Sequence, residues 1–196
     1  MHHRILRSTS TPGPLESVLE ALEQLRHCGS AIEWIVAADS ALQKGLVTRR
    51  QLETLFGGST RDRRLLARVD ARSESGTETI VRVALRSAGV RLRPQVTIEG
   101  VGRVDMLIGD RLVVEVDGYA WHGDRRSFEE DRRRDLALMM RGYAVVRLSY
   151  RRVVEDWTAV EHDLRELVRR GEHRWRGRHG AKNDAAIASP ASPGRR

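Results

Sequence analysis

Three acidic residues interrupt two neighbouring apolar segments of the sequence, and their types and spacing point to metal chemistry. Asp105 lies within one apolar run, and Glu115 and Asp117 lie within the next. Gly109-Asp110 between the runs is typical of a tight turn, which predicts a hairpin of two strands. Glu115 and Asp117 are two residues apart and therefore leave the same face of a strand, and the turn can bring Asp105 beside them.

Carboxylates gathered in this way need a compensating cation, because burying them unpaired would cost several kcal/mol each. Carboxylate oxygens select hard ions such as Mg²⁺ or Mn²⁺. A Mg²⁺ ion held by one or two carboxylates, water and phosphate oxygens is suited to phosphodiester hydrolysis. Structural alternatives exist: Asp105 could be a buried partner of Arg103 or Arg147, and Asp117 could end its strand before Gly118.

The composition fits a nucleic-acid-binding protein and excludes several other classes. The chain has 196 residues, a formal net charge of +8, and only two lysines, Lys44 and Lys182, among its 35 basic residues. Arginine is the better phosphate ligand of the two. Cys28 is the single cysteine, which excludes a disulfide framework and a thiolate zinc site within the monomer. No apolar run approaches the ~20 residues of a membrane span, and we expect a cytoplasmic protein without membrane contact.

Hydrophobic periodicity predicts a small helical region at the N-terminus. Leu15, Val18, Leu19, Leu22 and Leu25 have the spacing of an amphipathic helix that stops at Gly29. Further helices are expected over residues 32–45, over 48–57 with a Thr48/Gln51 capping box, and over 61–69. If the stripe from Leu15 to Leu25 were exposed, it could serve as the contact face of a homodimer.

The pattern changes after Asp70 to a mixture of helices and strands. We expect a helix from Ser75 to Gly89, strands at 95–99, 104–108 and 112–117, a helix at 125–141, a strand at 143–149, and a last helix around 160–168. This order predicts a mixed α/β fold. The expected organisation is a flexible leader (1–13), a helical N-terminal region (14–70), an α/β domain (71–170) and a disordered basic tail (171–196).

The sequence resembles the restriction-endonuclease-like superfamily named PD-(D/E)XK. The order Asp…Glu-x-Asp lies on a helix-β-β-β-helix-β scaffold, and the stretch VDGYAWHGD resembles the His-Gly-x-x-Trp-His segment of very-short-patch repair endonucleases. Residues 75–170, through SGTETIVRVALRSAGV, GRVDMLIGDRLVVEVDGYAWHG and FEEDRRRDLALMMRGYAVVRLS, resemble uncharacterised endonuclease-like domains related to that repair enzyme. Residues 31–56 resemble a helical segment that accompanies such domains in antitoxin-like proteins.

The resemblance implies a metal-dependent DNA endonuclease, with nicking of a single strand as one form of its activity and with Asp105 and Glu115 as ligands of Mg²⁺ or Mn²⁺. Asp117 would occupy the position of the usual lysine, adding a ligand or accepting a proton from water. His122 would act as general base or orient the scissile phosphate. Glu78 matches the acid that the first helix of this fold often supplies, although it can also be the capping partner of Ser75.

Four arginines are candidates for contacts with the DNA backbone, namely Arg132, Arg133, Arg134 and Arg147. The alternating charges around the first three are also typical of a solvated helix face. The absence of a lysine near Asp117 leaves a second hypothesis open. The chain could be a DNA-binding or toxin–antitoxin-associated module that keeps the fold without cleavage.

Overall fold

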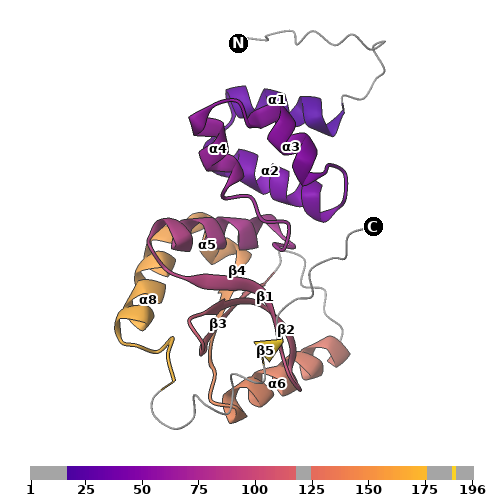
Figure 1. Ribbon diagram of the computed structural model, residues 1–196. Coiled ribbons are helices and arrows are strands. Elements are labelled where there is room, and N and C mark those ends of the chain that lie inside the picture. Colours follow the sequence, from indigo (N-terminus) through magenta and orange to yellow (C-terminus); the bar gives the residue numbers. More distant parts are fainter. Residues whose placement is uncertain (1–16, 118–124, 176–186, 189–196) are drawn as a thin grey trace.

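The computed structural model describes residues 17–117, 125–175 and 187–188 of the chain. Four helices come first, and a sheet flanked by helices follows them (Figure 1). The predicted order of helix, three strands, helix and strand is confirmed, and two helices rather than one follow the fourth strand. The fold is mixed α/β, consistent with the expected restriction-endonuclease-like architecture.

The N-terminal helices are set by their first residues. Each begins after a serine or threonine whose side-chain oxygen accepts a backbone N–H of the first turn, which satisfies a donor that the helix cannot. The predicted Thr48/Gln51 capping box is present. The helices are α1 (Val18–Cys28), α2 (Ala31–Gln43), α3 (Arg49–Phe56) and α4 (Thr60–Leu66).

The apolar side of α1 is used inside the protein. Leu22 is buried, and Leu19 and Leu25 pack against the same cluster, which contains Trp34 and Phe56. Leu15 lies outside the described residues. The leucines expected to form a homodimer contact are thus covered by the protein's own helices wherever they are described, and the structure does not support that homodimer.

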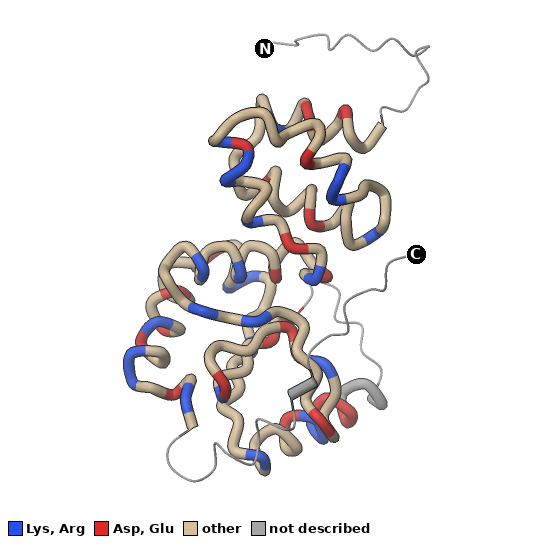
Figure 2. Tube along the Cα trace, viewed as in Figure 1, with Lys and Arg blue, Asp and Glu red and all other residues tan. Residues whose placement is uncertain are grey.

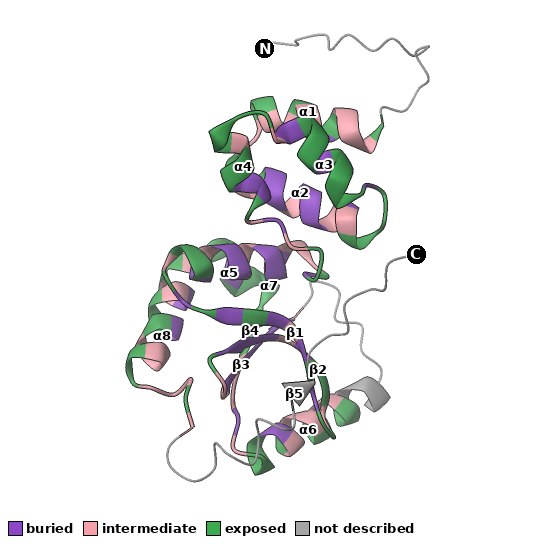
Figure 3. Ribbon diagram, viewed as in Figure 1, coloured by how far each residue is buried: buried purple, intermediate pink, exposed green. Residues whose placement is uncertain are grey.

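The sheet has the strand order β4-β3-β2-β1-β5, in which β3 and β4 are parallel and the other neighbours are antiparallel. Helices α5 and α8 cover one face and α6 covers the other, so that the strands are buried between them (Figure 3). The elements are α5 (Gly76–Ser87), β1 (Leu92–Ile98), β2 (Gly102–Ile108), β3 (Leu112–Asp117), α6 (Arg125–Met140), β4 (Ala144–Ser149), α7 (Tyr150–Glu155), α8 (Trp157–Arg169) and β5 (Ile187–Ala188).

The hairpin of β1 and β2 changes face in its middle. Strand alternation would put Val104 and Met106 on one face, yet Met106 packs on the α5 side and Val104 on the α6 side. The change occurs where Gln95 faces Asp105, and Gln95 has a φ of 51°, in the left-handed region that non-glycine residues rarely adopt. A local backbone distortion of this kind changes the direction of side chains, and here it lies at Gln95 and Asp105.

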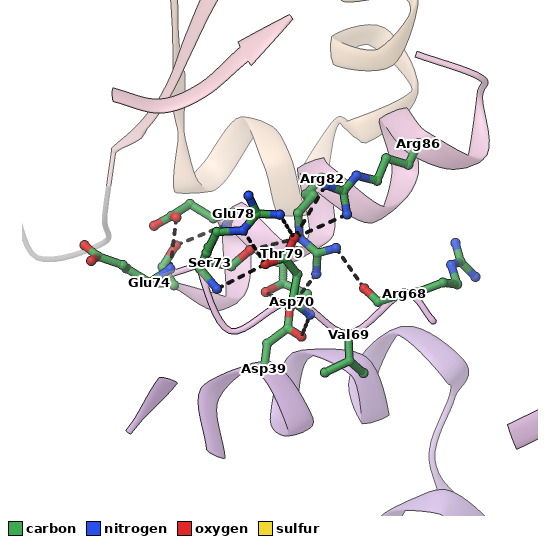
Figure 4. A network of polar contacts seen from close by, with 12 residues as sticks. Asp39, Arg68, Val69, Asp70, Ser73, Glu74, Glu78, Thr79, Arg82 and Arg86 are labelled. Carbon is green, nitrogen blue, oxygen red and sulfur yellow. Dashed lines mark hydrogen bonds and ion pairs between the residues drawn. The ribbon is translucent and has the colours of Figure 1, made fainter. Parts of the chain in front are cut away.

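A buried polar network joins the helical region to α5 (Figure 4). Asp39 of α2 accepts hydrogen bonds from Arg82 Nη2 at 2.5 Å, Thr79 Oγ1 at 2.8 Å and the Asp70 backbone N–H at 2.7 Å. Arg82 also donates to Ser73 Oγ at 3.0 Å. Asp39 and Arg82 are 1% and 0% exposed, so the ion pair is removed from water on both sides. The network fixes the chain around residue 70, where the helical region meets the α/β part.

No helix in the described ranges combines the length and the apolar character that crossing a bilayer requires.

The described chain continues past α8 to Trp175, whose ring packs on Tyr143 with the two centroids 5.1 Å apart. Residues 171–175, which were expected to belong to a disordered tail, therefore form part of the packed structure. The leader lies outside the described residues, as does most of the remaining tail.

Candidate active site

Two of the predicted acids lie side by side at the point where β2 and β3 separate. The backbone pairing of β2 with β3 ends at Met106 and Val114. Beyond it, the Asp105 backbone N–H donates to Glu115 Oε2 at 3.2 Å, and the Val116 backbone N–H donates to Asp105 Oδ2 at 2.8 Å. Each carboxylate therefore takes the place of a backbone acceptor on the opposite strand. This exchange holds both acids at one place in the sheet.

Glu78 approaches the pair from the first turn of α5. Its carboxylate accepts from the Glu74 backbone N–H at 3.0 Å and from Gln95 Nε2 at 2.9 Å. Ser75 Oγ accepts the Glu78 N–H, but the Glu78 carboxylate bonds to Glu74 rather than to Ser75, so only half of the expected capping box forms. Burial, and then the nearby charge of Asp105, raise the pKa of Glu78. The three acids thus interact electrostatically.

Glu115 has the most perturbed environment of the three. It is 5% exposed, and burial together with the charge of Asp105 raises its pKa to about 7. Arg134 Nη2 of α6 lies 2.9 Å from Glu115 Oε1 and offsets part of this effect. The Arg134 guanidinium offsets only part of the repulsion between Glu115 and Asp105, since the pKa of Glu115 stays raised. Such an excess of negative charge favours a cation.

Asp117 lies on the same face of β3 as Glu115 but has a different partner. Arg147 of β4 approaches it at 3.2 Å and also contacts Asp135 of α6 at 2.7 Å. The hydrogen bond to Asp135, and then the acidic charges around it, raise the pKa of Arg147 above its ordinary value. Asp117 is also the last residue of β3, as its structural alternative expected, and it lies at the edge of an ion-pair network.

The expected trio of ligands is not assembled in the described part of the chain. No group of three or more His, Cys, Asp or Glu side chains there is arranged to hold a metal ion. Asp105 and Glu115 form a pair, and Asp117 is engaged with Arg147. His122 lies outside the described residues. A metal at this place would therefore have two carboxylate ligands from the sheet.

The candidate DNA-binding arginines divide into two groups. Arg132 and Arg133 are exposed on α6. Arg134 bonds to Glu115 and to the Arg103 carbonyl oxygen, and Arg147 is held by Asp117 and Asp135, so these two neutralise acids of the site. The alternative in which Asp105 is the partner of Arg103 or Arg147 does not occur among the described contacts.

Gln95 is the site residue that sequence inspection missed. Nothing in its residue type indicates the strained backbone or the contact with Glu78. A signal did exist in the register, since a hairpin turning near Gly100 places Gln95 opposite Asp105. The role of Arg134 as partner of Glu115 was also missed, because it depends on how α6 packs across the sheet.

The raised pKa of Glu115 leads to a prediction on stability. Below about pH 4.5 this carboxyl is protonated in both folded and unfolded chains. As the pH rises from about 4.5 to about 7, the unfolded chain loses this proton while the folded chain keeps it, so stability falls until the folded pKa is passed. Glu115→Gln should therefore match the wild type near pH 4 and exceed it at pH 8 by on the order of 3 kcal/mol. Urea denaturation from pH 4 to 8 in EDTA measures the difference. A variant less stable than the wild type at pH 8 would contradict it.

The comparison with protein families places the site within a matched segment. The family model REase_MTES_1575, a restriction-endonuclease-like family, matches residues 78–168. The segment begins at Glu78, contains the Asp105 and Glu115 pair, and leaves out the N-terminal helices. No curated protein and no solved structure matches the chain.

Proposed function

We propose that the protein is a divalent-metal-dependent endonuclease that hydrolyses DNA phosphodiester bonds at the Asp105 and Glu115 pair. The observation that carries the proposal is the position of these two acids side by side on adjacent strands, where Glu115 is buried and Asp105 is half-buried. Glu78 lies beside them, and among the described residues only Arg134 makes an ion pair with either of the two acids. The match of residues 78–168 to a restriction-endonuclease-like family supports DNA as the substrate.

The donor set fits Mg²⁺ or Mn²⁺. Hard divalent cations prefer oxygen ligands, and Mg²⁺ is commonly held by one or two carboxylates while water and substrate phosphate fill the other positions. Asp105 and Glu115 would supply the protein ligands. A bound ion would polarise the scissile phosphate and lower the pKa of an attacking water.

The other residues of the site have proposed roles of their own. Glu78, fixed by Gln95 and the Glu74 N–H, would accept a proton from water at its free carboxylate oxygen. Ligation by Asp117 would require its ion pair with Arg147 to open. Arg132 and Arg133 would contact the DNA backbone from the exposed side of α6.

Two finer proposals rest on the resemblance in sequence. The site would be of the PD-(D/E)XK type, with an arrangement related to very-short-patch repair endonucleases. His122 would then act as general base or orient the phosphate. Asp117 at the position of the usual lysine would be the chief difference from that type.

A module that binds DNA without cutting it is the second candidate. The observation that favours it is the pairing of Glu115 with Arg134 and of Asp117 with Arg147, which satisfies part of the acidic charge without any metal. Such a module would use the same fold in a DNA-binding or toxin–antitoxin-associated protein.

A plasmid assay separates the two candidates. We expect wild-type protein to convert supercoiled plasmid to open-circular or linear DNA in Mg²⁺ or Mn²⁺ and not in EDTA, because the carboxylate pair would use the metal to activate water and to neutralise charge on the phosphate. Duplex binding should be measured in EDTA at several salt concentrations. Binding without cleavage in either metal would favour the module, and the absence of both would reject both candidates.

A further inference from the structure

A hollow of about 830 Å³ lies at the end of the sheet remote from the acids. It is bounded by the start of β1, the turn between β2 and β3, the end of α8 and residues 173–175. Gly109 in that turn is four residues from Asp105, a separation of about 13 Å along the strand. The hollow therefore belongs to a different surface from the candidate active site.

The wall of the hollow is arginine-rich. Arg91, Arg93, Arg165, Arg169 and Arg174 line it, and Asp110 is the one acid among its described lining residues. Basic positions at the start of β1 and along α8 lie on the same side of the molecule in Figure 2. Like charges gathered around one concave surface repel one another and focus a positive potential, which an anion would relieve.

Three of these arginines have no carboxylate partner among the described residues, so their guanidinium groups are available to a ligand. In the described part of the chain, Arg91, Arg93 and Arg174 form no ion pair, and all three are exposed. Arg93 reaches only the Gly109 carbonyl oxygen at 3.5 Å, and Arg174 donates to His173 Nε2 at 3.0 Å. Arg165 and Arg169 each contact a glutamate on their own helix that does not line the hollow.

The hollow is held open by a fixed backbone. The Asp110 N–H donates to the His173 carbonyl oxygen at 3.0 Å, and the Trp175 N–H donates to Asp110 Oδ1 at 3.2 Å. Gly109 has a φ of 62°, and a Cβ atom there would lie 2.3 Å from the His173 carbonyl oxygen, so only glycine permits this approach. Arg111 binds the same segment through an ion pair in which its Nη1 lies 2.7 Å from Glu172 Oε2.

Polar and apolar groups occur together in this wall. His173 Nδ1 and Trp175 Nε1 are buried and have no hydrogen-bond partner among the residues that the structure describes. Val90 and Val168 supply apolar surface beside them. A ligand with both a phosphate and a less polar portion suits such a lining.

We propose that this hollow is a second, non-catalytic anion site that binds a phosphate group through Arg91, Arg93 and Arg174. Arginine guanidinium groups bind phosphate oxygens through paired N–H donors, and three such groups on a rigid wall are preorganised for this ligand. The phosphate can belong to a free nucleotide or to DNA beyond the cleavage site. The proposal does not depend on cleavage, because binding to this surface requires neither metal nor the acids.

The test compares two triple variants with the same change in charge. The first is Arg91→Gln/Arg93→Gln/Arg174→Gln, and the control is Arg50→Gln/Arg61→Gln/Arg64→Gln on the N-terminal helices, where the arginines are also exposed. Binding of pyrophosphate, ATP and a DNA duplex is measured by calorimetry and fluorescence anisotropy in EDTA. We expect the first variant to bind at least one probe about tenfold more weakly than the wild type, and more weakly than the control.

The pattern of loss identifies the source of the phosphate. A loss confined to pyrophosphate and ATP indicates a free ligand, and a loss confined to the duplex indicates the DNA backbone. Equal affinities of the two triple variants for all three probes would overturn the proposal. If the first variant has a lowered melting temperature, Arg91→Glu alone provides the comparison, because it reverses one exposed charge without removing a contact.

Discussion

Replacing Asp105 by asparagine is expected to slow metal-dependent plasmid nicking by about a thousandfold while the protein remains folded. Asparagine keeps the size of the side chain and can still accept the Val116 N–H, which Asp105 accepts at 2.8 Å. It removes the negative charge that a divalent cation requires. The assay is the rate of open-circular product in Mg²⁺ or Mn²⁺.

The control for this variant is Asp163→Asn on α8. Asp163 is an exposed acid that contacts Arg152 at 3.6 Å, far from the sheet acids in the sequence and on a different element. It should nick plasmid at the wild-type rate. Residual activity of Asp105→Asn above about a tenth of wild type would contradict a role in metal binding.

A measurement of stability distinguishes a variant that has lost a metal ligand from one that has lost structure. The charge of Asp105 contributes to the raised pKa of both Glu115 and Glu78, so its removal relieves repulsion among buried acids. An Asp105→Asn protein that is inactive and at least as stable as the wild type at pH 8 has the signature of a functional site. In a purely structural carboxylate, the same change would lower stability.

The elements of the fold were accessible from the sequence because local signals set them. Thr48 and Gln51 define a helix start by their own hydrogen bonds, and Gly109 carries the positive φ that the predicted turn requires. The strand at 112–117 was predicted with its bounds as observed. In each case the neighbours in sequence are also the partners in space.

The site was accessible only in part because its partners are distant in the chain. Asp105 and Glu115 could be paired through one turn, but Arg134 reaches Glu115 by the packing of α6 across the sheet. The position of Gln95 in the site depends on a positive φ angle, which its residue type does not predict. Such contacts follow from the assembled fold.

The helical region and the candidate active site share α5 as a common element. Thr79 and Arg82 of α5 bond to Asp39 of α2 (Figure 4). Glu78, one residue before Thr79, accepts a hydrogen bond from Gln95. The start of α5 is therefore held from both sides. The N-terminal helices, which lie outside the family match, thus help to fix the position of Glu78.

The Asp39 and Arg82 ion pair supplies the largest expected effect on stability. Asp39→Ala should lower the free energy of unfolding by about 4 kcal/mol, because it leaves the fully buried Arg82 guanidinium without its counter-charge. Urea denaturation followed by tryptophan fluorescence, to which Trp34 on α2 contributes, measures the loss. Glu53→Ala is the matched control, since Glu53 makes an exposed ion pair with Arg49 and should change stability by less than about 0.5 kcal/mol.

A double variant distinguishes a lost charge partner from lost packing. Burial raises the pKa of Asp39 even beside Arg82, which shows that ionising this pair is costly. Asp39→Leu/Arg82→Met removes both charges and fills the space with apolar atoms, so it should recover most of the stability that Asp39→Ala loses. A double variant as unstable as Asp39→Ala would instead mean that the bonds from Asp39 to Thr79 and the Asp70 N–H hold the two parts together. Nicking by the recovered double variant would then report whether Glu78 keeps its position without the ion pair.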